Sequence, residues 1–530
     1  MSSLLKVSAV VPVFNPGSNI DECIQSLIDQ SLPPDEYEVI FVDDGSTDGT
    51  PARLDALAAE HPHVRVEHIP PSGWPGKPRN VGIEMARGEF VYFVDNDDWV
   101  GHEALERMYD RAVERDADVV MGKVVGRGKY VPRALFVKNR DDVTLEWGPL
   151  VRLLAPHKLF RKSLLDEYGI RFPEGRRRLE DHVFVMHAYF HARRISILAD
   201  YPCYYWVLRR DESTNASYQA FEAKGYYANV REVLDLVEAH TEPGRLRDKL
   251  LVHWYRGKML GRVGGRWFPN RDPKVRRELY EEVGALARER YGPEFDTFLS
   301  RSLRVRSYLL REGTYEQLSA LAHWEAELRA DVTVQDTRWQ PDGTFVMPFK
   351  GRLVAKGDKP IQFRQEGERL LWVPPEELHG DIPEDLLDMT PAMKKANVQP
   401  MIRARHDKTD FVLPHEHTMR LEPAGDGYVT PVLRGEARIE PGKAAAGSKP
   451  RAGRWEVLAA TTVCGFSAAG RVRAETTAAE YEIRIDQDGA VARRSTTPLS
   501  AVKGLLARRL PGLARVIRRK KERRSAAAAH

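Results

Sequence analysis

Two short apolar runs of the sequence end in adjacent acidic residues. Residues 38–42 (EVIFV) are followed by Asp43 and Asp44, and residues 89–94 (EFVYFV) are followed by the acidic stretch 95–98 (DNDD). Parallel strands end at the sheet edge where α/β proteins bind ligands, and adjacent carboxylates repel unless a cation or donor neutralises them. A divalent metal carrying a diphosphate would satisfy one pair, and a nucleotide base and ribose the other. The pattern predicts an enzyme that handles a nucleoside-diphosphate compound.

The elements that must position these acids alternate along the chain. Apolar side chains between the β-rich runs recur at helical spacing. Strand and helix linked by short connections predict right-handed βαβ units and a parallel sheet. The β-rich runs are residues 7–13, 38–42, 64–68, 90–94 and 118–121.

Several motifs of this region together resemble family 2 glycosyltransferases with the Rossmann-like GT-A fold. The similarity covers about residues 6–215 and is carried by VSAVVPVFN at 7–15, VIFVDDGSTDGT at 39–50, PRNVGIEMARGEFVYFVDNDDW at 78–99 and LEDHVF at 179–184. Segments 121–136 and 204–215 resemble the enzymes that attach N-acetylglucosamine to the poly(ribitol phosphate) of wall teichoic acid. Those relatives also carry a helical linker and a trimer-forming C-terminal β domain, for which this chain has space.

The resemblance implies donor-binding roles near the first acidic pair. Asp44 would accept a hydrogen bond from the uridine base, and Pro12 and Phe14 would border that base. Arg79 would reach the nucleotide or the diphosphate. The alternatives are a turn acid at Asp44 and an ordinary surface arginine at position 79.

A second group of residues is expected around the diphosphate. In the Asp-X-Asp element, Asp97 would bind the metal directly, and Asp95 would bind the ribose or a metal-bound water. Oxygen ligands and phosphates suit Mg²⁺ or Mn²⁺, which would offset charge on the leaving diphosphate. Asp98 is an alternative cap for the following helix, and a solvated loop is the alternative for the whole stretch. Arg209 and Arg210 follow an aromatic cluster and could close over the diphosphate.

The catalytic base is assigned to the LED motif at 179–181. In the family, the aspartate of this pair is the general base, so Asp181 would take the proton of the acceptor hydroxyl. Glu180 would bind sugar hydroxyls, with a helix cap as the alternative role of the pair. One base opposite the leaving group implies a single displacement with inversion. The region contains no Gln-X-X-Arg-Trp element, which argues against a processive cellulose- or hyaluronan-type synthase.

The rest of the chain divides by pattern. We expect a GT-A domain at 1–219, a helical linker at 220–330, an antiparallel β-sandwich region of one or two units at 331–495, and a basic amphipathic tail at 496–530. Arg256, Lys258 and Arg262 of the linker would contact acceptor phosphates by resemblance, and a solvated helix face explains them equally well. The β region is expected to form a homo-oligomer, a trimer by resemblance.

Charge and cysteine content bear on location. Residues 499–524 carry ten Lys and Arg against one Glu, interleaved with apolar side chains. This segment fits a helix lying on an anionic membrane; nucleic acid is the rival partner, but the tail lacks stacking aromatics. Three widely spaced cysteines, and the lack of a signal-peptide pattern, favour a reduced, cytoplasmic protein. We therefore expect a cytoplasmic protein at the inner face of the membrane.

These observations converge on one function with two alternatives. The expected activity is inverting, metal-dependent transfer of a sugar, with N-acetylglucosamine favoured, from a UDP-sugar to an anionic cell-wall polymer such as a teichoic acid. A family 2 transferase with a capsule or lipid-linked acceptor is the first alternative. A scaffold that only binds nucleotide-sugar is the second, and intact Asp95, Asp97 and Asp181 argue against it.

Overall fold

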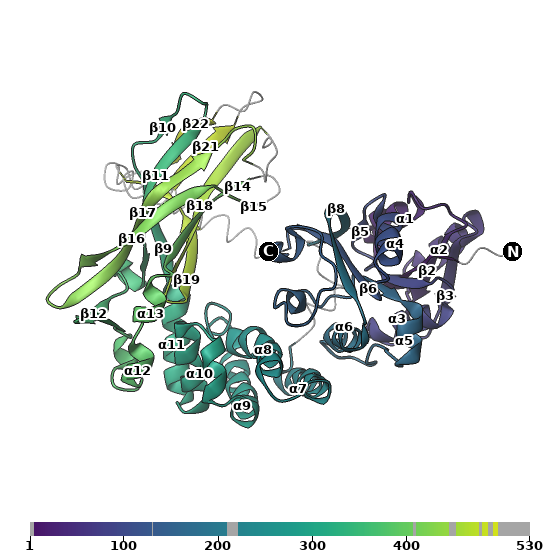
Figure 1. Cartoon of the computed structure of the whole chain (residues 1–530), viewed down its shortest axis with the longest axis horizontal. Helices are drawn as coiled ribbons and strands as arrows, with labels where there is room; N and C mark the ends of the chain where they lie inside the picture. The colour runs from purple at the N-terminus through teal and green to yellow at the C-terminus, as the bar shows by residue number, and fades with distance from the viewer. Residues whose placement is uncertain are drawn as a thin grey trace, which may run out of the picture. The chain divides into compact units, whose positions relative to one another are not determined.

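The structure of the protein is a computed structural model with two compact units (Figure 1). One unit comprises residues 1–263 with 270–299, and the other comprises 264–269 with 300–530. The structure describes residues 5–129, 131–208, 221–405, 410–444, 452–475, 480–485 and 491–496. Arg209, Arg210 and the predicted basic tail lie outside these ranges. The domain boundaries at 219 and 330 stay predictions.

An eight-stranded sheet forms the centre of the first unit, in the order β3-β2-β1-β4-β7-β6-β8-β5. Its strands are β1 (Val7–Val13), β2 (Tyr37–Asp43), β3 (Val64–His68), β4 (Phe90–Phe93), β5 (Trp99–Val100), β6 (Val119–Arg127), β7 (Leu159–Arg161) and β8 (Ile195–Val207). β1 and β2 are buried along their whole length, as expected for strands covered on both faces.

The sheet is mixed, so the prediction of a parallel sheet holds only for part of it. The pairs β1–β2, β2–β3, β1–β4 and β6–β8 are parallel, whereas β7 runs antiparallel to both β4 and β6, and β5 runs antiparallel to β8. In the described part of the connection from β6 to β7, the helical segments are short 3₁₀ turns only. Without a crossover helix, the chain returns in the opposite direction.

Helices flank this sheet (Figure 1), and those before β6 lie in the intervals that the sequence predicts. They are α1 (Asp21–Ile28), α2 (Thr50–Glu60), α3 (Gly76–Met85), α4 (Ala104–Glu114), α5 (Lys162–Glu167) and α6 (Glu180–His191). Ile20, Ile24 and Leu27, which recur at helical spacing before and along α1, are buried. The alternation of strand and helix therefore confirms a mixed α/β domain.

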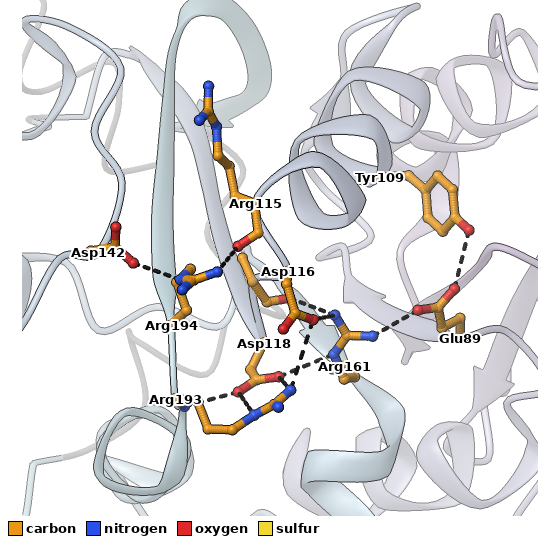
Figure 2. Close-up of polar contacts among 10 residues, drawn as sticks. Glu89, Tyr109, Arg115, Asp116, Asp118, Asp142, Arg161, Arg193 and Arg194 are labelled. Atoms are coloured by element: carbon orange, nitrogen blue, oxygen red, sulfur yellow. Dashed lines mark hydrogen bonds and ion pairs between the residues drawn. The ribbon is translucent and has the colours of Figure 1, made fainter.

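An ion-pair network joins several strands of the sheet at one end (Figure 2). Asp118, which is buried, accepts hydrogen bonds from Arg161 Nε at 3.0 Å, Arg193 N at 2.8 Å and Arg193 Nη2 at 3.0 Å. Arg161 Nη1 also donates to Glu89 Oε1 at 2.7 Å. Burial raises the pKa of Asp118, but the arginines outweigh burial and leave that pKa below its usual value. The network joins the starts of β4, β6 and β8, so it lies opposite the edge at which the acidic residues follow β4.

Helices of the predicted linker follow, and they confirm the helical expectation for this region. The first unit contains α7 (Ala223–Ala239), α8 (Arg245–Trp254), a π-helical turn (Tyr255–Met259) and α9 (Pro273–Arg290). The second unit begins with α10 (Arg301–Arg311) and α11 (Tyr315–Glu327). Thr314 and Gln317 form a reciprocal capping box at the start of α11.

The second unit continues as an antiparallel β region, as the alternating pattern predicts. Nearly all its pairings are antiparallel, with one short parallel pairing between β9 and β20. Its strands are β9 (Arg329–Val334), β10 (Arg338–Trp339), β11 (Phe345–Val354), β12 (Phe363–Glu366), β13 (Arg369–Trp372), β14 (Asn397–Ala404), β15 (Asp410–Val412), β16 (His415–Pro423), β17 (Tyr428–Ile439), β18 (Gly453–Val463), β19 (Phe466–Arg471), β20 (Arg473–Ala474), β21 (Glu480–Ile485) and β22 (Val491–Thr496). Short helices α12 (Glu384–Leu387) and α13 (Thr390–Met393) lie between β13 and β14. In the described ranges, no helix is both long enough and apolar enough to cross a bilayer.

Candidate functional site

Asp95 lies in a tight turn directly after β4. The turn is closed by a hydrogen bond from Asp98 N to the Asp95 carbonyl at 3.1 Å. Asp95 Oδ1 accepts a hydrogen bond from Arg79 Nη2 at 2.8 Å, and Asp95 Oδ2 lies 3.0 Å from His157 Nε2. Burial raises the pKa of Asp95, but His157 and Arg79 outweigh it and hold that pKa far below its usual value. Asp95 is therefore a fixed negative charge.

His157 belongs to the site and was missed by the sequence prediction. It is buried and comes from the chain just before β7, far in sequence from the acidic motif. Its ring stacks on Tyr204 with centroids 3.9 Å apart, and its Nδ1 has no hydrogen-bond partner among the described residues. Burial lowers the pKa of His157, and Asp95 opposes that shift. The only signal was a histidine at the start of a buried strand, which is too common to single out.

Asp98 holds the turn in place and does not cap α4, contrary to the alternative considered above. Its carboxylate accepts hydrogen bonds from Tyr204 Oη and Val207 N, both at 2.7 Å. Burial, followed by the charges of Asp97 and Asp95, raises the pKa of Asp98 well above its usual value. Tyr204 also accepts a hydrogen bond from Asp95 N at 3.1 Å. The aromatic cluster on β8 thus shapes the acidic turn and does more than fill space.

The turn offers a donor set that fits a divalent cation. Asp95, Asp98 and His157 each place a ligand atom within 4.8 Å of the others, and the half-buried Asp97 lies in the same turn. Carboxylate oxygens suit Mg²⁺ and Mn²⁺. His157 faces Asp95 with Nε2, and its buried Nδ1 has no hydrogen-bond partner among the described residues.

The first acidic pair has two different environments. Asp43 accepts a hydrogen bond from Ser46 N at 3.0 Å and lies 2.8 Å from His68 Nδ1, so it shapes the turn after β2. Asp44 is buried and accepts hydrogen bonds from Ser72 N at 2.7 Å and Ser72 Oγ at 2.8 Å. A nucleotide base that binds Asp44 would therefore share the Asp44 carboxylate with Ser72.

Pro12 and Phe14, predicted to border the base, come from the neighbouring strand β1. Pro12 is buried and pairs with Val42 of β2. Phe14, just beyond the strand, is 46% exposed, an unusual exposure for a large apolar side chain. Asp44 N donates to the Val13 carbonyl at 2.8 Å, which places Phe14 and Asp44 at the same end of the paired strands.

Arg79 lies between two acidic residues rather than on the surface. It is buried on α3, and its Nη1 reaches Glu180 Oε1 at 3.3 Å while Nη2 binds Asp95. Its guanidinium also lies over the Phe172 ring, 5.1 Å from the centroid. Asp95 and Glu180 thus share one arginine, which links the turn after β4 to the start of α6.

Asp181 lies in the first turn of α6, after Leu179, whose φ of 65° marks the entry into the helix. His182 N donates to Asp181 Oδ1 at 2.9 Å. Burial and the neighbouring Glu180 raise the pKa of Asp181 to about 7, although Lys258 and Arg79 act in the opposite direction. A carboxylate with a pKa near neutral pH is well suited to accept a proton.

Two lysines interact electrostatically with Asp181. Lys158, which follows His157, is buried, and burial lowers its pKa to about 7 although Asp181 opposes the shift. Lys258 lies in the π-helical turn; burial lowers its pKa too, again opposed by Asp181. Sequence reasoning did not identify Lys158, and it assigned Lys258 to acceptor binding without linking it to Asp181.

The linker contacts the residue next to the candidate base within the first unit. Trp254 Nε1 of α8 donates to His182 Nδ1 at 3.0 Å, next to Asp181. Arg262 lies over the rings of Phe221 and Tyr226, at 5.4 and 5.2 Å from their centroids. Arg256 is exposed; burial of part of its side chain and the field of Arg152 lower its pKa. Of the three predicted linker cations, only Lys258 is therefore linked electrostatically to Asp181 in the described part of the chain.

Two family models match this chain in succession. The model "Glycosyl transferase family 2" matches residues 8–201, and "Glycosyl transferase TarS linker domain" matches residues 223–322. The first range contains the acidic turn and the candidate base, and the second contains the linker cations. The fold and site thus define a protein of the glycosyltransferase class.

Curated proteins give the same picture. The chain is 33% identical to a poly(ribitol-phosphate) beta-glucosyltransferase of Bacillus spizizenii, over 63% of this chain and 52% of the relative. It is 37% identical to the poly(ribitol-phosphate) beta-N-acetylglucosaminyltransferase TarS of Staphylococcus aureus, over 45% of this chain and 43% of TarS. It is 31% identical to the glycosyltransferase GlyG of Streptococcus pneumoniae, over 37% of this chain and 68% of GlyG. The chain belongs to glycosyl transferase family 2, and it spans about half the length of the first two relatives.

Solved structures of TarS have a related fold. A structure of S. aureus TarS residues 1–349 in complex with UDP-GlcNAc is 29% identical, with a TM-score of 0.55 over 60% of this chain and 90% of that chain. A structure described as S. aureus TarS is 21% identical, with a TM-score of 0.54 over 94% of this chain and 86% of that chain. The second match shows that the whole order of α/β domain, helices and β region follows a known fold.

Proposed function

We propose that this protein transfers a hexose from a UDP-sugar to a poly(ribitol phosphate) acceptor. One observation supports this most directly: Asp181, a carboxylate with a pKa of about 7, is flanked by cations from both the α/β domain and the linker. A base of this kind can deprotonate a hydroxyl, and the surrounding positive charge suits a polymer whose hydroxyls alternate with phosphates. Relatives named for this acceptor support the choice of polymer.

The proposed chemistry is a single displacement. Asp181 accepts the proton of the acceptor hydroxyl. At the same time, the oxygen of that hydroxyl forms a bond to the anomeric carbon of the sugar. The bond from that carbon to the diphosphate oxygen breaks, UDP leaves, and the configuration inverts. Glu180, oriented by Arg79 at 3.3 Å, binds sugar hydroxyls.

The remaining site residues would bind the donor. Asp44 and Phe14 would hold the base, with Pro12 forming the strand beneath it. Asp97 and Asp95 would hold Mg²⁺ or Mn²⁺, and such an ion supplies positive charge that stabilises the departing diphosphate. Arg79, which fixes Asp95, would add positive charge near the same group. We further propose that Arg209 and Arg210, outside the described residues, close over the diphosphate.

The sugar is proposed to be N-acetylglucosamine, with glucose as its main competitor. The relatives' names divide between these two sugars: TarS is named for N-acetylglucosamine, and the B. spizizenii protein is named for glucose. The TarS structure in complex with UDP-GlcNAc supports the first choice. Linkage and sugar would be read from the product by nuclear magnetic resonance.

The test of the proposed activity uses purified full-length protein, poly(ribitol phosphate) and a panel of UDP-sugars. We expect UDP release that depends on the acceptor, and loss of about 10²–10⁴-fold in rate for Asp181→Asn with donor binding retained. The matched control is Asp166→Asn, which makes the same change at an exposed acid on α5 and should keep the wild-type rate. Acceptor-independent rates, or an active Asp181→Asn variant, would contradict the proposal.

Assembly and location complete the proposal. The β region, proposed to be a β-sandwich, would join copies of the chain into a homotrimer, and the tail would hold the enzyme on the cytoplasmic face of an anionic membrane. Light scattering on the full chain tests the first point, and a monomer would refute it. Sedimentation with anionic liposomes tests the second: deletion of residues 499–530 should abolish binding and leave the rate on soluble acceptor unchanged.

A further inference from the structure

Three histidines meet away from the candidate active site. His187 and His191 lie one turn apart on α6, and His240 ends α7. Each offers a ring nitrogen within 4.8 Å of the other two. The ring centroids are 5.0 Å apart for His187–His191, 5.5 Å for His187–His240 and 5.2 Å for His191–His240. Spacing of four residues on a helix places two imidazoles on one face, and the third ring comes from another element.

The tautomer of His240 follows from its backbone contact. His240 Nδ1 lies 2.9 Å from the carbonyl oxygen of Leu236, which can only accept a hydrogen bond. The proton therefore lies on Nδ1, and Nε2 keeps its lone pair. Metal-binding histidines are commonly oriented in this way, with the second nitrogen donating to a carbonyl.

Neighbouring rings restrict the orientation of two of the imidazoles. Tyr168 stacks on His191 with centroids 4.1 Å apart and an interplanar angle of 24°. Phe190 stacks on His240 at 5.0 Å and 13°. Aromatic packing alone explains the stacking, but it does not require three imidazoles to converge on one another.

We propose that His187, His191 and His240 bind one divalent transition-metal ion, with zinc as the best match and water as the remaining ligand. Imidazole nitrogens favour zinc over Mg²⁺, which prefers oxygen. A tetrahedral zinc holds its nitrogens about 3.3 Å apart, so small side-chain rotations would bring the present arrangement to that geometry. The site is separate from the oxygen-rich turn at Asp95.

The bound ion would connect the α/β domain to the linker. His187 and His191 lie toward the end of the helix whose first turn carries Glu180 and Asp181, and His240 ends the first linker helix. Zinc there would fix α6 against α7 and so steady the position of the base relative to the linker cations. This role goes beyond the proposed transfer reaction and does not depend on it.

Zinc content of the full-length protein tests the proposal. Chelator-treated protein is titrated with ZnCl₂ in excess Mg²⁺, which competes for the acidic turn, and bound zinc is measured by mass spectrometry. We expect one equivalent in the wild type and its loss in His191→Gln and in His240→Gln. His323→Gln, an exposed histidine on α11, should keep the full equivalent. A wild type that binds no zinc, or histidine variants that bind as much as the wild type, would overturn the site.

A second measurement avoids reliance on folded variants. Diethyl pyrocarbonate modification of the wild type, mapped by peptide mass spectrometry, should be slowed at His187, His191 and His240 when zinc is added, while His323 reacts at its original rate. Unchanged modification of the three histidines at a zinc concentration that saturates binding would refute the assignment. Neither readout requires sugar transfer, so failure of the proposed activity would leave this test intact.

Discussion

The ionisation of Asp181 should set the acid limb of the pH–rate profile. Its carboxyl group must be ionised to accept a proton, and burial with Glu180 raises its pKa to about 7. With that pKa, Asp181 is ionised in about a tenth of the free enzyme at pH 6. Below pH 6, kcat/KM should fall about tenfold for each unit by which the pH is lowered. An aspartate at the ordinary value of about 3.9 would leave the rate flat down to about pH 5.

Removal of one cation should move this limb in a known direction. Lys258 favours the ionised form of Asp181, so Lys258→Met should raise the pKa of Asp181 further and shift the acid limb to higher pH, by about one unit. Lys274→Met, which removes an exposed linker cation from the start of α9, is the matched control and should leave the limb in place.

The assay is UDP release from a UDP-sugar at subsaturating acceptor, followed from about pH 5 to pH 9. The variants are compared by the pH of the inflection and not by the maximum rate. Lys258 is also proposed to bind acceptor phosphates, so its removal could change the maximum rate. A wild-type profile that stays flat through pH 6, or an inflection that moves equally in Lys258→Met and Lys274→Met, would refute the assignment of Asp181 as the base.

Three further outcomes follow from the structure. Chelator should abolish activity and Mn²⁺ should restore it, and Asp97→Ala should be inactive with or without added metal; full activity in excess chelator would contradict the metal role. His157→Phe should weaken binding of the donor, measured calorimetrically with a UDP-sugar and Mn²⁺, because Asp95 loses its neighbour at 3.0 Å; unchanged binding would remove His157 from the site. Asp118→Asn should lower the free energy of unfolding at neutral pH by about 2 kcal/mol, since buried charge-assisted hydrogen bonds are lost. The folded pKa of Asp118 lies below its unfolded value, so its contribution exists above about pH 4 and disappears as the pH falls; denaturant unfolding should show the gap between Asp118→Asn and wild type closing in acid.

Local sequence patterns predicted much of the first domain. Strand ends, the acidic turn after β4 and the helical face of α7 depend on neighbours in the sequence, so they could be read without a structure. His157 and Lys158 could not, because they reach the site only when β7 enters the sheet between β4 and β6. The antiparallel direction of β7 was missed for the same reason, since its pairing is long-range.

Side-chain partners were also beyond the sequence. Arg79 was assigned to the diphosphate on its position in the motif, but nothing in the sequence placed it between Asp95 and Glu180. The β region was recognised from alternation, whereas the parallel pairing of β9 with β20 joins residues far apart in the chain. Such pairings depend on the order and register of strands across the whole sheet. A short stretch of sequence does not contain that information.

Arg79 also makes the two halves of the site thermodynamically dependent on each other. Its guanidinium pairs with Asp95, proposed to hold the metal or ribose, and with Glu180, proposed to bind sugar hydroxyls, so anything that neutralises one carboxylate leaves more of the positive charge for the other. By thermodynamic linkage, if one ligand changes the affinity of the protein for a second ligand, the second changes the affinity for the first by the same factor. Binding of the metal and binding of the sugar should therefore share an interaction energy, and this thermodynamic cooperativity would depend on a single buried side chain.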